Sequence, residues 1–375
     1  MAHAYTPGLK VLHESKIIKE RQLPLKGNVV VKKGQTVSPD DIVATTDLPG
    51  NVRMLNVANL LNIDAPDIRD VMLLKVGDTV QKNGMMAETK GIFGMFKSQA
   101  NSPVDGTIEA ISEVTGQVTL REAPIPVEID AYVSGTVKKV LPEEGVLVET
   151  DAVFIQGIFG IGGENRGNLE VVVESREDEL TVDLLKPEHA GKILVGGSYI
   201  SLAAYKKAME LKVAGIVVGG FNYHDLEDVL GYTLGVAITG SEDLPTSLIL
   251  TEGYGRIRMG SRTFDLLKQH QGKFASVNGA TQIRAGVIRP EIVIPLSADE
   301  LLGDHKDIHA SEGIQPGSIV RVIRAPYFGR MGTVVSLPAE LQKMESETMV
   351  RVAEIEIDGE TFLVPRANLE MVETD

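Results

Sequence analysis

The stretch Gly317-Ser-Ile-Val-Arg-Val-Ile-Arg-Ala-Pro-Tyr-Phe-Gly-Arg-Met-Gly-Thr-Val334 decides the fold of the C-terminal part of this sequence. Residues 319–323 have the period of two that is typical of a strand, and Gly329 and Gly332 suit positions where the backbone turns sharply or takes a positive φ. Residues 351–357 alternate in the same way, and the Asp-Gly pair that follows them predicts a type I′ hairpin turn. This part of the chain is therefore predicted to be a small β-barrel.

The same stretch resembles the KOW motif of ribosomal and transcription-elongation proteins, in which the pattern G-x-x-G-x-V follows a strand and a loop. The resemblance implies an SH3-like barrel whose loop between the first two strands contacts RNA or a protein partner. Here that loop contains Tyr327 and Phe328, flanked by Arg324 and Arg330. Aromatic rings can stack on bases while guanidinium groups bind phosphates. The alternative is that Tyr327 or Phe328 fills the core of its own barrel.

Echoed segments organise the N-terminal part of the sequence. Val31-Lys-Lys-Gly-Gln-Thr-Val37 is echoed by Val76-Gly-Asp-Thr-Val80, and Ser102-Pro-Val-Asp-Gly-Thr-Ile108 is echoed by Ala131-Tyr-Val-Ser-Gly-Thr-Val137. The first pair predicts a strand, a glycine turn and another strand, and the second places a Gly-Thr step between apolar strand residues. Between the members of the first pair, residues 59–72 predict a short helix.

The segment from Val76 to Ile108 resembles the lipoyl/biotinyl fold, and more closely the barrel-sandwich hybrid domain of the C subunit of Rnf-type electron-transport complexes. The resemblance implies a flattened barrel. Carrier domains of this fold bear lipoate or biotin on a lysine at a tight hairpin, and Lys90 stands where that lysine would be sought. The sequence around Lys90 and the longer loop up to Asn101 depart from the carrier pattern. We therefore interpret Lys90 as a solvated loop residue and expect no cofactor.

Residues 186–296 have a different rhythm, in which strands alternate with helices. Strands are predicted at residues 193–195, 216–218, 235–238 and 247–250, helices at residues 201–213 and 263–270, and a helical turn at residues 225–230. This alternation predicts a parallel sheet covered on both faces.

Two glycine pairs, Gly196-Gly197 and Gly219-Gly220, follow neighbouring strands of that predicted sheet. Ligands bind outside the carboxyl ends of parallel strands, where helix N-termini expose N–H groups. Ser198 and Ser201 could then help to hold a phosphate or carboxylate group. The alternative, which needs no ligand, is that the glycines only allow tight turns from strand to helix.

Composition narrows the classes of function. The chain has 375 residues, which predicts two to four domains, and its net charge of −15 argues against a protein that coats nucleic acid or an acidic membrane. It has no cysteine, which excludes disulfides, thiolate metal sites and cysteine nucleophiles. The N-terminal residues lack the apolar stretch of a signal peptide, and no run approaches the ~18 apolar residues of a membrane span. A cytoplasmic location without membrane contact is expected.

Other motifs carry weaker hypotheses. The glycine-rich run of residues 157–167 lacks the ending of a P-loop and predicts a flexible turn or hinge. His305 and His309 stand four apart without the glutamate of the zinc-peptidase signature, and His224-Asp225 has no nucleophile motif beside it. We interpret three aspartates as the solvated side of the short predicted helix: Asp64, Asp67 and Asp70. We interpret a scattered set of arginines as partners of surface carboxylates: Arg256, Arg258, Arg262, Arg284 and Arg289.

We predict a multi-domain, β-rich α+β protein. Its parts are barrel-sandwich-like β modules (residues 1–150), a connecting β segment (151–185), a central α/β parallel-sheet domain (186–296), a linker (297–312) and an SH3-like barrel (313–375). No nucleophile, metal or cofactor signature is visible, so the leading hypothesis is a non-enzymatic adaptor or assembly subunit that engages a protein complex, linked to transcription or translation through the KOW resemblance. The alternative is a binding protein or enzyme for a phosphate- or carboxylate-bearing small molecule at the glycine-lined strand ends. A protein partner is expected, while RNA binding and self-association stay open.

Overall fold

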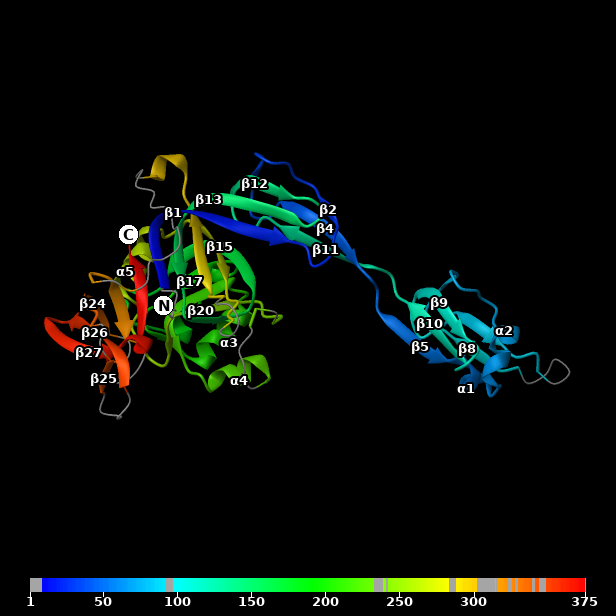
Figure 1. Ribbon diagram of the computed structural model, residues 1–375. Coiled ribbons are helices and arrows are strands. Elements are labelled where there is room, and N and C mark those ends of the chain that lie inside the picture. The colour runs from blue at the N-terminus through cyan, green and yellow to red at the C-terminus, as the bar shows by residue number, and fades with distance from the viewer. Residues whose placement is uncertain are drawn as a thin grey trace.

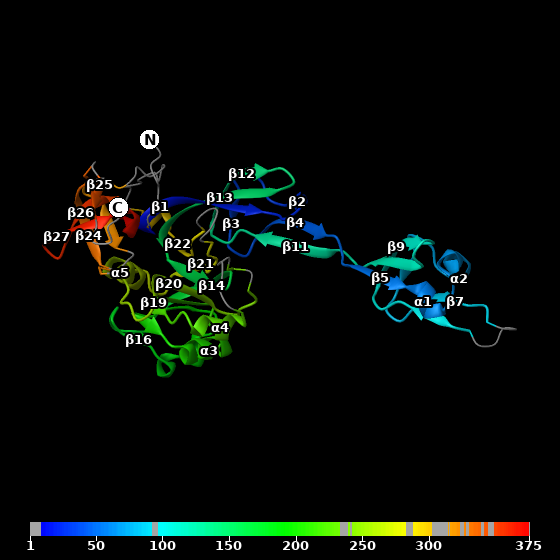
Figure 2. The same ribbon diagram turned by 60° about the horizontal axis from the view of Figure 1, so that its bottom comes forward.

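The structure is a computed structural model of the chain. It describes residues 9–91, 97–232, 239–240, 242–282, 288–301, 314, 316–322, 326–327, 330–338, 341–343 and 349–374. It is β-rich and contains several modules, which confirms the predicted fold class. Figure 1 shows a large body at one end and an arm that ends in a small module. Figure 2 shows the same separation from a second direction.

Two long strands form the base of the arm. β1 (Leu9–Gln22) and β13 (Gly145–Gln156) pair antiparallel, and both run out of the body into the arm (Figure 1). On the body side, β13 also pairs with β22 (Glu291–Pro295). The strand β13 passes through residue 150 without a break, so the body and the arm share it.

The arm contains two β modules, one inserted into the other. The proximal module lies next to the body and adds β2 (Asn28–Val29), β3 (Thr36–Val37), β4 (Ile42–Leu48), β11 (Ile125–Asp130) and β12 (Gly135–Leu141). The distal module is inserted between β4 and β11 and contains β5 (Val52–Asn56), β6 (Thr79–Val80), β7 (Met85–Glu88), β8 (Gln99–Asn101), β9 (Gly106–Ser112) and β10 (Gln117–Arg121). Each module has its own cluster of buried apolar side chains.

The helix expected over residues 59–72 is divided into three short pieces. These are α1 (Val57–Leu61), the 3-10 turn η1 (Ala65–Asp67) and α2 (Ile68–Val71). Asn62 takes a left-handed conformation with φ of 54° directly after α1, and a proline opens η1. Both features interrupt helical hydrogen bonding, because a left-handed residue ends a helix and proline has no N–H to donate.

The two modules repeat the same hydrogen bonds at their echoed segments. Gly34 N–H donates to the carbonyl of Val137 at 2.7 Å, and Gly77 N–H donates to the carbonyl of Ile108 at 2.8 Å. In return, Val137 and Ile108 each donate to the carbonyl of the residue after that glycine, at 2.9 Å in both modules. Both glycines have a positive φ, 83° and 95°, which a side chain would strain. The sequence echo is therefore a structural repeat.

The body is an α/β domain with a parallel sheet. Four parallel strands lie in the order β15 (Glu164–Val171), β17 (Ile193–Val195), β19 (Gly215–Phe221) and β20 (Ser247–Tyr254), and β14 (Phe159–Ile161) pairs antiparallel with β20. Helices α3 (Leu202–Glu210) and α4 (Asp225–Leu230) cover one face, and α5 (Ser261–Gln269) covers the other. Described elements that complete the body are β16 (Glu179–Leu180), η2 (Val182–Leu184), η3 (Pro187–His189), β18 (Tyr199–Ile200), β21 (Phe274–Asn278) and η4 (Ala298–Glu300).

Most predicted elements of this domain are confirmed, with one difference. The predicted strand at residues 235–238 lies outside the described residues. The glycine-rich run of residues 157–167 forms β14 and the start of β15, both in the sheet, instead of a flexible turn. Its glycines allow close approach of other backbone, since a Cβ on Gly160 would lie 2.6 Å from the carbonyl oxygen of Gly279.

The C-terminal part, called the C-terminal barrel below after the fold predicted for it, is an antiparallel β module that begins at β23 (Ile319–Val322). It continues with β24 (Met331–Ser336), β25 (Leu341–Lys343), β26 (Met349–Ile357), β27 (Glu360–Pro365), the 3-10 turn η5 (Arg366–Asn368) and β28 (Leu369–Thr374). The main strands pair in the order β28-β23-β24-β26-β27. Asp358 and Gly359 both have a positive φ, 53° and 85°, as the predicted type I′ turn requires. The barrel adjoins the body through β28, which pairs in parallel with β1.

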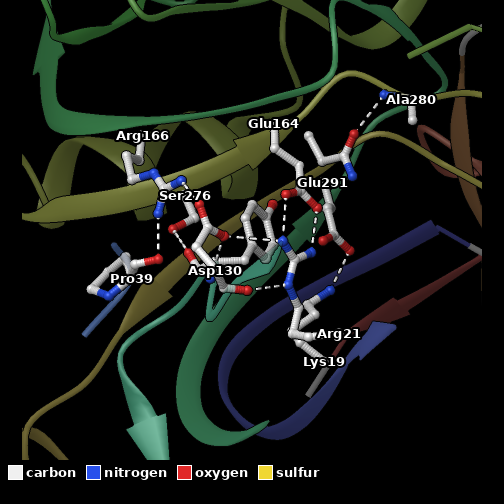
Figure 3. A network of polar contacts seen from close by, with 11 residues as sticks. Lys19, Arg21, Pro39, Asp130, Glu164, Arg166, Ser276, Ala280 and Glu291 are labelled. Carbon is white, nitrogen blue, oxygen red and sulfur yellow. Dashed lines mark hydrogen bonds and ion pairs between the residues drawn. The ribbon is translucent and has the colours of Figure 1, made fainter. Parts of the chain in front are cut away.

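A network of charged side chains fixes the arm to the body (Figure 3). Arg21 of β1 donates to Asp130 of the proximal module at 3.0 Å and to Glu164 of the body at 2.6 Å. Arg166 of the body pairs with the same Asp130 carboxylate, and Lys19 pairs with Glu291. These groups are mostly shielded from water, so their attraction is stronger than that of surface ion pairs. The proximal module is therefore held in one orientation.

Candidate functional site

A pocket lined by arginines lies between the α/β domain and the C-terminal barrel. Its volume is about 700 Å³, within the range of small-molecule sites. In the described part of the chain, six arginines and the two carboxylates of Glu252 and Asp358 line it; the arginines are Arg176, Arg256, Arg258, Arg262, Arg321 and Arg330. The chain as a whole carries a net charge of −15, so this concentration of positive charge is a local feature.

The body contributes the carboxyl end of β20 and the segment that leads into α5. Thr251 and Glu252 of β20 line the pocket, and residues 256–258 follow after a glycine turn. Gly260 is the N-cap of α5, and its N–H donates to Glu252 Oε1 at 2.9 Å. The pocket is thus at the edge of the parallel sheet where strands end, the position at which α/β folds bind ligands.

The barrel contributes the opposite wall. Arg321 projects from β23, Arg330 precedes β24, and Asp358 lies in the turn between β26 and β27. The Arg321 side chain is 4% exposed, pairs with Glu252 and donates to the carbonyl of Thr251 at 3.4 Å. Arg330 pairs with Asp358. Both carboxylates of the pocket are therefore already used by barrel arginines.

The arginines on the body wall keep an excess of positive charge. Arg256 pairs with Glu179 and stacks over Tyr199 at 4.4 Å, and Arg176 pairs with its neighbour Glu177 at 3.2 Å. Arg258 is exposed and, in the part of the chain that is described, forms no hydrogen bond or ion pair. Guanidinium groups stay protonated at any physiological pH and offer donors that match carboxylate and phosphate oxygens. The pocket can therefore bind an anion.

The glycine pairs at the strand ends are covered by the chain itself. A Cβ on Gly219 would lie 1.9 Å from the carbonyl oxygen of Ile257, and one on Gly220 would lie 2.0 Å from that of Gly255. Gly197 is covered in the same way by the carbonyl of Asp178, at 2.4 Å. The structure thus places the backbone of residues 255–257 over β19, at the position where the sequence analysis proposed a ligand.

The two serines beside these glycines have local partners. Ser198 is buried and donates its hydroxyl to the carbonyl of Glu177 at 2.7 Å. Ser201 is the N-cap of α3, where its side chain accepts from the N–H of Ala204 at 3.2 Å. Gly196 packs against Val218 and Leu180. None of these three positions lines the arginine pocket.

The predicted contact loop of the barrel is described only in part. Arg324 and Phe328 lie outside the described residues. Tyr327 is half-buried, packs against the barrel core and has its ring centroid 4.6 Å from that of Phe362, as in the alternative in which it fills its own barrel. Arg330 lines the pocket, so it is the member of the predicted loop that the structure brings to the candidate site.

The remaining candidates do not gather into a site. Lys90 is exposed, and His305 and His309 lie outside the described residues. Within the described ranges no group of three or more His, Asp or Glu side chains could hold a metal ion. The side chain of His224 is exposed at the start of α4 and its ring is 5.8 Å from that of Tyr223. In the same described part, no helix is long and apolar enough to cross a membrane.

Sequence reasoning singled out four of the pocket arginines, Arg256, Arg258, Arg262 and Arg330, but gave them no common site. Arg256, Arg258 and Arg262 follow the predicted strand at residues 247–250 within a short distance, and this spacing was the available signal. Arg176 and Arg321 lie far from them in the sequence, so only the fold brings them together. No known protein family matches the chain, and no curated protein matches it. The functional proposal rests on the geometry of the site.

Proposed function

We propose that this chain is a non-catalytic binding protein and that its arginine-lined pocket binds a small anionic molecule bearing phosphate or carboxylate groups. The observation that supports it is the gathering of six arginines against two carboxylates around about 700 Å³. Carboxylates of the chain pair with four of these arginines, and an anion bound beside Arg258 would neutralise positive charge that these pairs leave. Hydroxyl groups of Ser261 and Thr263 and the apolar side chains of Ile257 and Met331 also line the pocket and would contact the uncharged part of such a molecule.

Isothermal titration calorimetry with pyrophosphate, citrate and ATP tests this proposal. We expect saturable binding of at least one of them with one molecule per chain. Arg258→Ala should weaken it about 10- to 100-fold, since a hydrogen bond to a charged group contributes about 1.5–3 kcal/mol. The matched control is Arg351→Ala, because Arg351 is exposed on β26 and does not line the pocket. Absence of binding by all three anions, or equal loss in both variants, would refute the proposal.

A second candidate function is that of an adaptor in a protein complex, and the position of the distal module favours it. That module stands away from the body at the end of the arm (Figures 1 and 2). Among its described residues it exposes seven large apolar side chains: Val52, Met54, Leu60, Leu73, Val76, Met85 and Val114. Exposed apolar side chains on a projecting module are typical of a protein-binding surface.

The adaptor candidate is tested by identifying proteins that co-purify with the chain from its own host. A variant in which a short linker replaces residues 51–122 should lose any partner that the distal module binds. The KOW resemblance of the barrel adds the proposal that such a partner belongs to the transcription or translation machinery. Filter binding of RNA by the wild type and by an Arg324→Ala, Arg330→Ala variant tests that part; equal binding by both would exclude the barrel loop as the contact.

A further inference from the structure

The C-terminal barrel shares little apolar surface with the body. The apolar cluster of the barrel includes no residue of the α/β domain, and the two clusters of that domain include no residue of the barrel. The described contacts between them include the parallel pairing of β28 with residues 9–11 of β1, the Arg321–Glu252 ion pair and the walls of the pocket. Contacts between domains that are polar and limited in extent permit relative motion.

Positive charges face each other across the pocket. Arg321 and Arg330 belong to the barrel, and the other four arginines belong to the α/β domain. Four of the six arginines already have a carboxylate partner, which is Glu252, Asp358, Glu179 or Glu177, so only a small excess of positive charge opposes docking of the barrel when no anion is bound. An anion with a single charged group can neutralise one wall. An anion with two or more groups can pair with both walls at once.

We infer that a multivalent anion in this pocket acts as a clamp that holds the C-terminal barrel against the α/β domain, an inference that rests on the proposed function. The complete site exists only when the barrel is docked, because the two walls belong to separate modules. A ligand that binds only the docked state stabilises that state by the factor 1 + [L]/Kd, which is about 100-fold at a hundredfold excess over Kd. Ligand binding and barrel docking are then reciprocally coupled.

Amide hydrogen exchange measured by mass spectrometry tests the clamp, with pyrophosphate as the divalent-group probe and acetate as the single-group probe. At a hundredfold excess of pyrophosphate over its Kd, exchange in residues 9–11 and 369–374 should slow by up to about 100-fold. Acetate should leave it unchanged. Exchange in β9 and β10 serves as the internal reference, because these strands belong to the distal module, which stands away from the body (Figure 1).

Variants separate the clamp from simple binding. Arg258→Glu should remove both the calorimetric signal of pyrophosphate and the slowing of exchange, whereas Arg351→Glu should keep both. If no anion binds by calorimetry, the proposed function fails and the clamp fails with it. If pyrophosphate binds and exchange in residues 9–11 and 369–374 stays as in the free protein, the clamp alone is refuted.

Discussion

Replacing Gly219 by alanine tests whether the strand end is closed by the chain itself. Gly219 lies in β19, and an ideal Cβ there would be 1.9 Å from the carbonyl oxygen of Ile257 and 3.0 Å from the N–H nitrogen of Met259. Real Cβ atoms stay at least 3.0 Å from such atoms, so the backbone of residues 257–259 would have to move by 3.0 − 1.9 = 1.1 Å. That segment cannot move freely, because Met259 is fully buried in the core under α5.

The magnitude follows from this overlap. Overpacking a core costs about 1–3 kcal/mol and sometimes more, while Gly-to-Ala replacement recovers about 0.4–1 kcal/mol from the unfolded state. Because the atom in the way is backbone, we expect the upper end of the range, a loss of about 3 kcal/mol in the free energy of unfolding. For a domain of this size that lowers the melting temperature by roughly 10 °C.

Thermal unfolding followed by the tyrosine signal measures the effect. The chain has no Trp and eight Tyr, and the five in residues 186–296 report on this domain: Tyr199, Tyr205, Tyr223, Tyr232 and Tyr254. Gly215→Ala in the same strand is the matched control, because its nearest contact is the Val277 side chain at 3.1 Å and not backbone. We expect that control to change stability by no more than about 1 kcal/mol. Equal melting of both variants and the wild type would refute the reasoning and return the glycine pair to the ligand hypothesis.

Three further predictions concern the Asp130 network between arm and body, the pH dependence of stability, and covalent modification of Lys90. Asp130→Asn removes the carboxylate that two arginines share, and it should lower the free energy of unfolding measured with urea by about 1–3 kcal/mol. The loss is smaller than for a fully buried ion pair, because the Asp130 side chain is 23% exposed. The control Asp64→Asn, at an exposed position, should change the free energy of unfolding by less than about 0.5 kcal/mol. Burial, with smaller effects of nearby cationic groups, lowers the pKa of His270, so its contribution to stability is present above the unfolded value of 6.5 and is lost as pH falls from that value through the lower pKa of the folded state. His270→Gln should therefore lose less melting temperature than the wild type between pH 7.5 and 5. Intact mass of the chain purified from its host should show no lipoyl or biotinyl group on Lys90, and a mass above the unmodified 40.4 kDa by either group would contradict that interpretation.

Local patterns predicted the elements of the α/β domain well, because each depends on neighbouring residues. The helix expected over residues 263–270 is α5, and the turn at Asp358 has the two positive φ values that its sequence demands. The echo between the N-terminal segments corresponds to a repeated turn in the structure, because the positive φ of each turn requires glycine whatever the distant contacts are. These features are fixed by periodicity and turn chemistry.

The pocket could not be predicted in the same way. Its residues range from Leu9 to Asp358, so its existence depends on how the barrel docks on β1 and on the α/β domain. The glycine pairs suggested a ligand site at a position that the chain itself covers, for a related reason. A glycine at a strand end signals that something approaches the backbone closely, but the sequence does not say whether a ligand or another segment does so, and here residues 255–257 do.

The connections between the modules indicate which of them can move. Two strands, β1 and β13, run from the body into the arm. Two segments of the chain connect the proximal module to the distal module, and they lie close together, since a Cβ on Gly50 would be 2.0 Å from the carbonyl oxygen of Glu122. The proximal module is held to the body by paired strands and by the Asp130 network. It resists rotation, because any rotation would break several hydrogen bonds at once. The barrel follows residues 297–312 in sequence and meets β1 over three residue pairs, beside the arginine pocket. A ligand in that pocket therefore acts at the contact between the barrel and the body, where the positive charge is gathered.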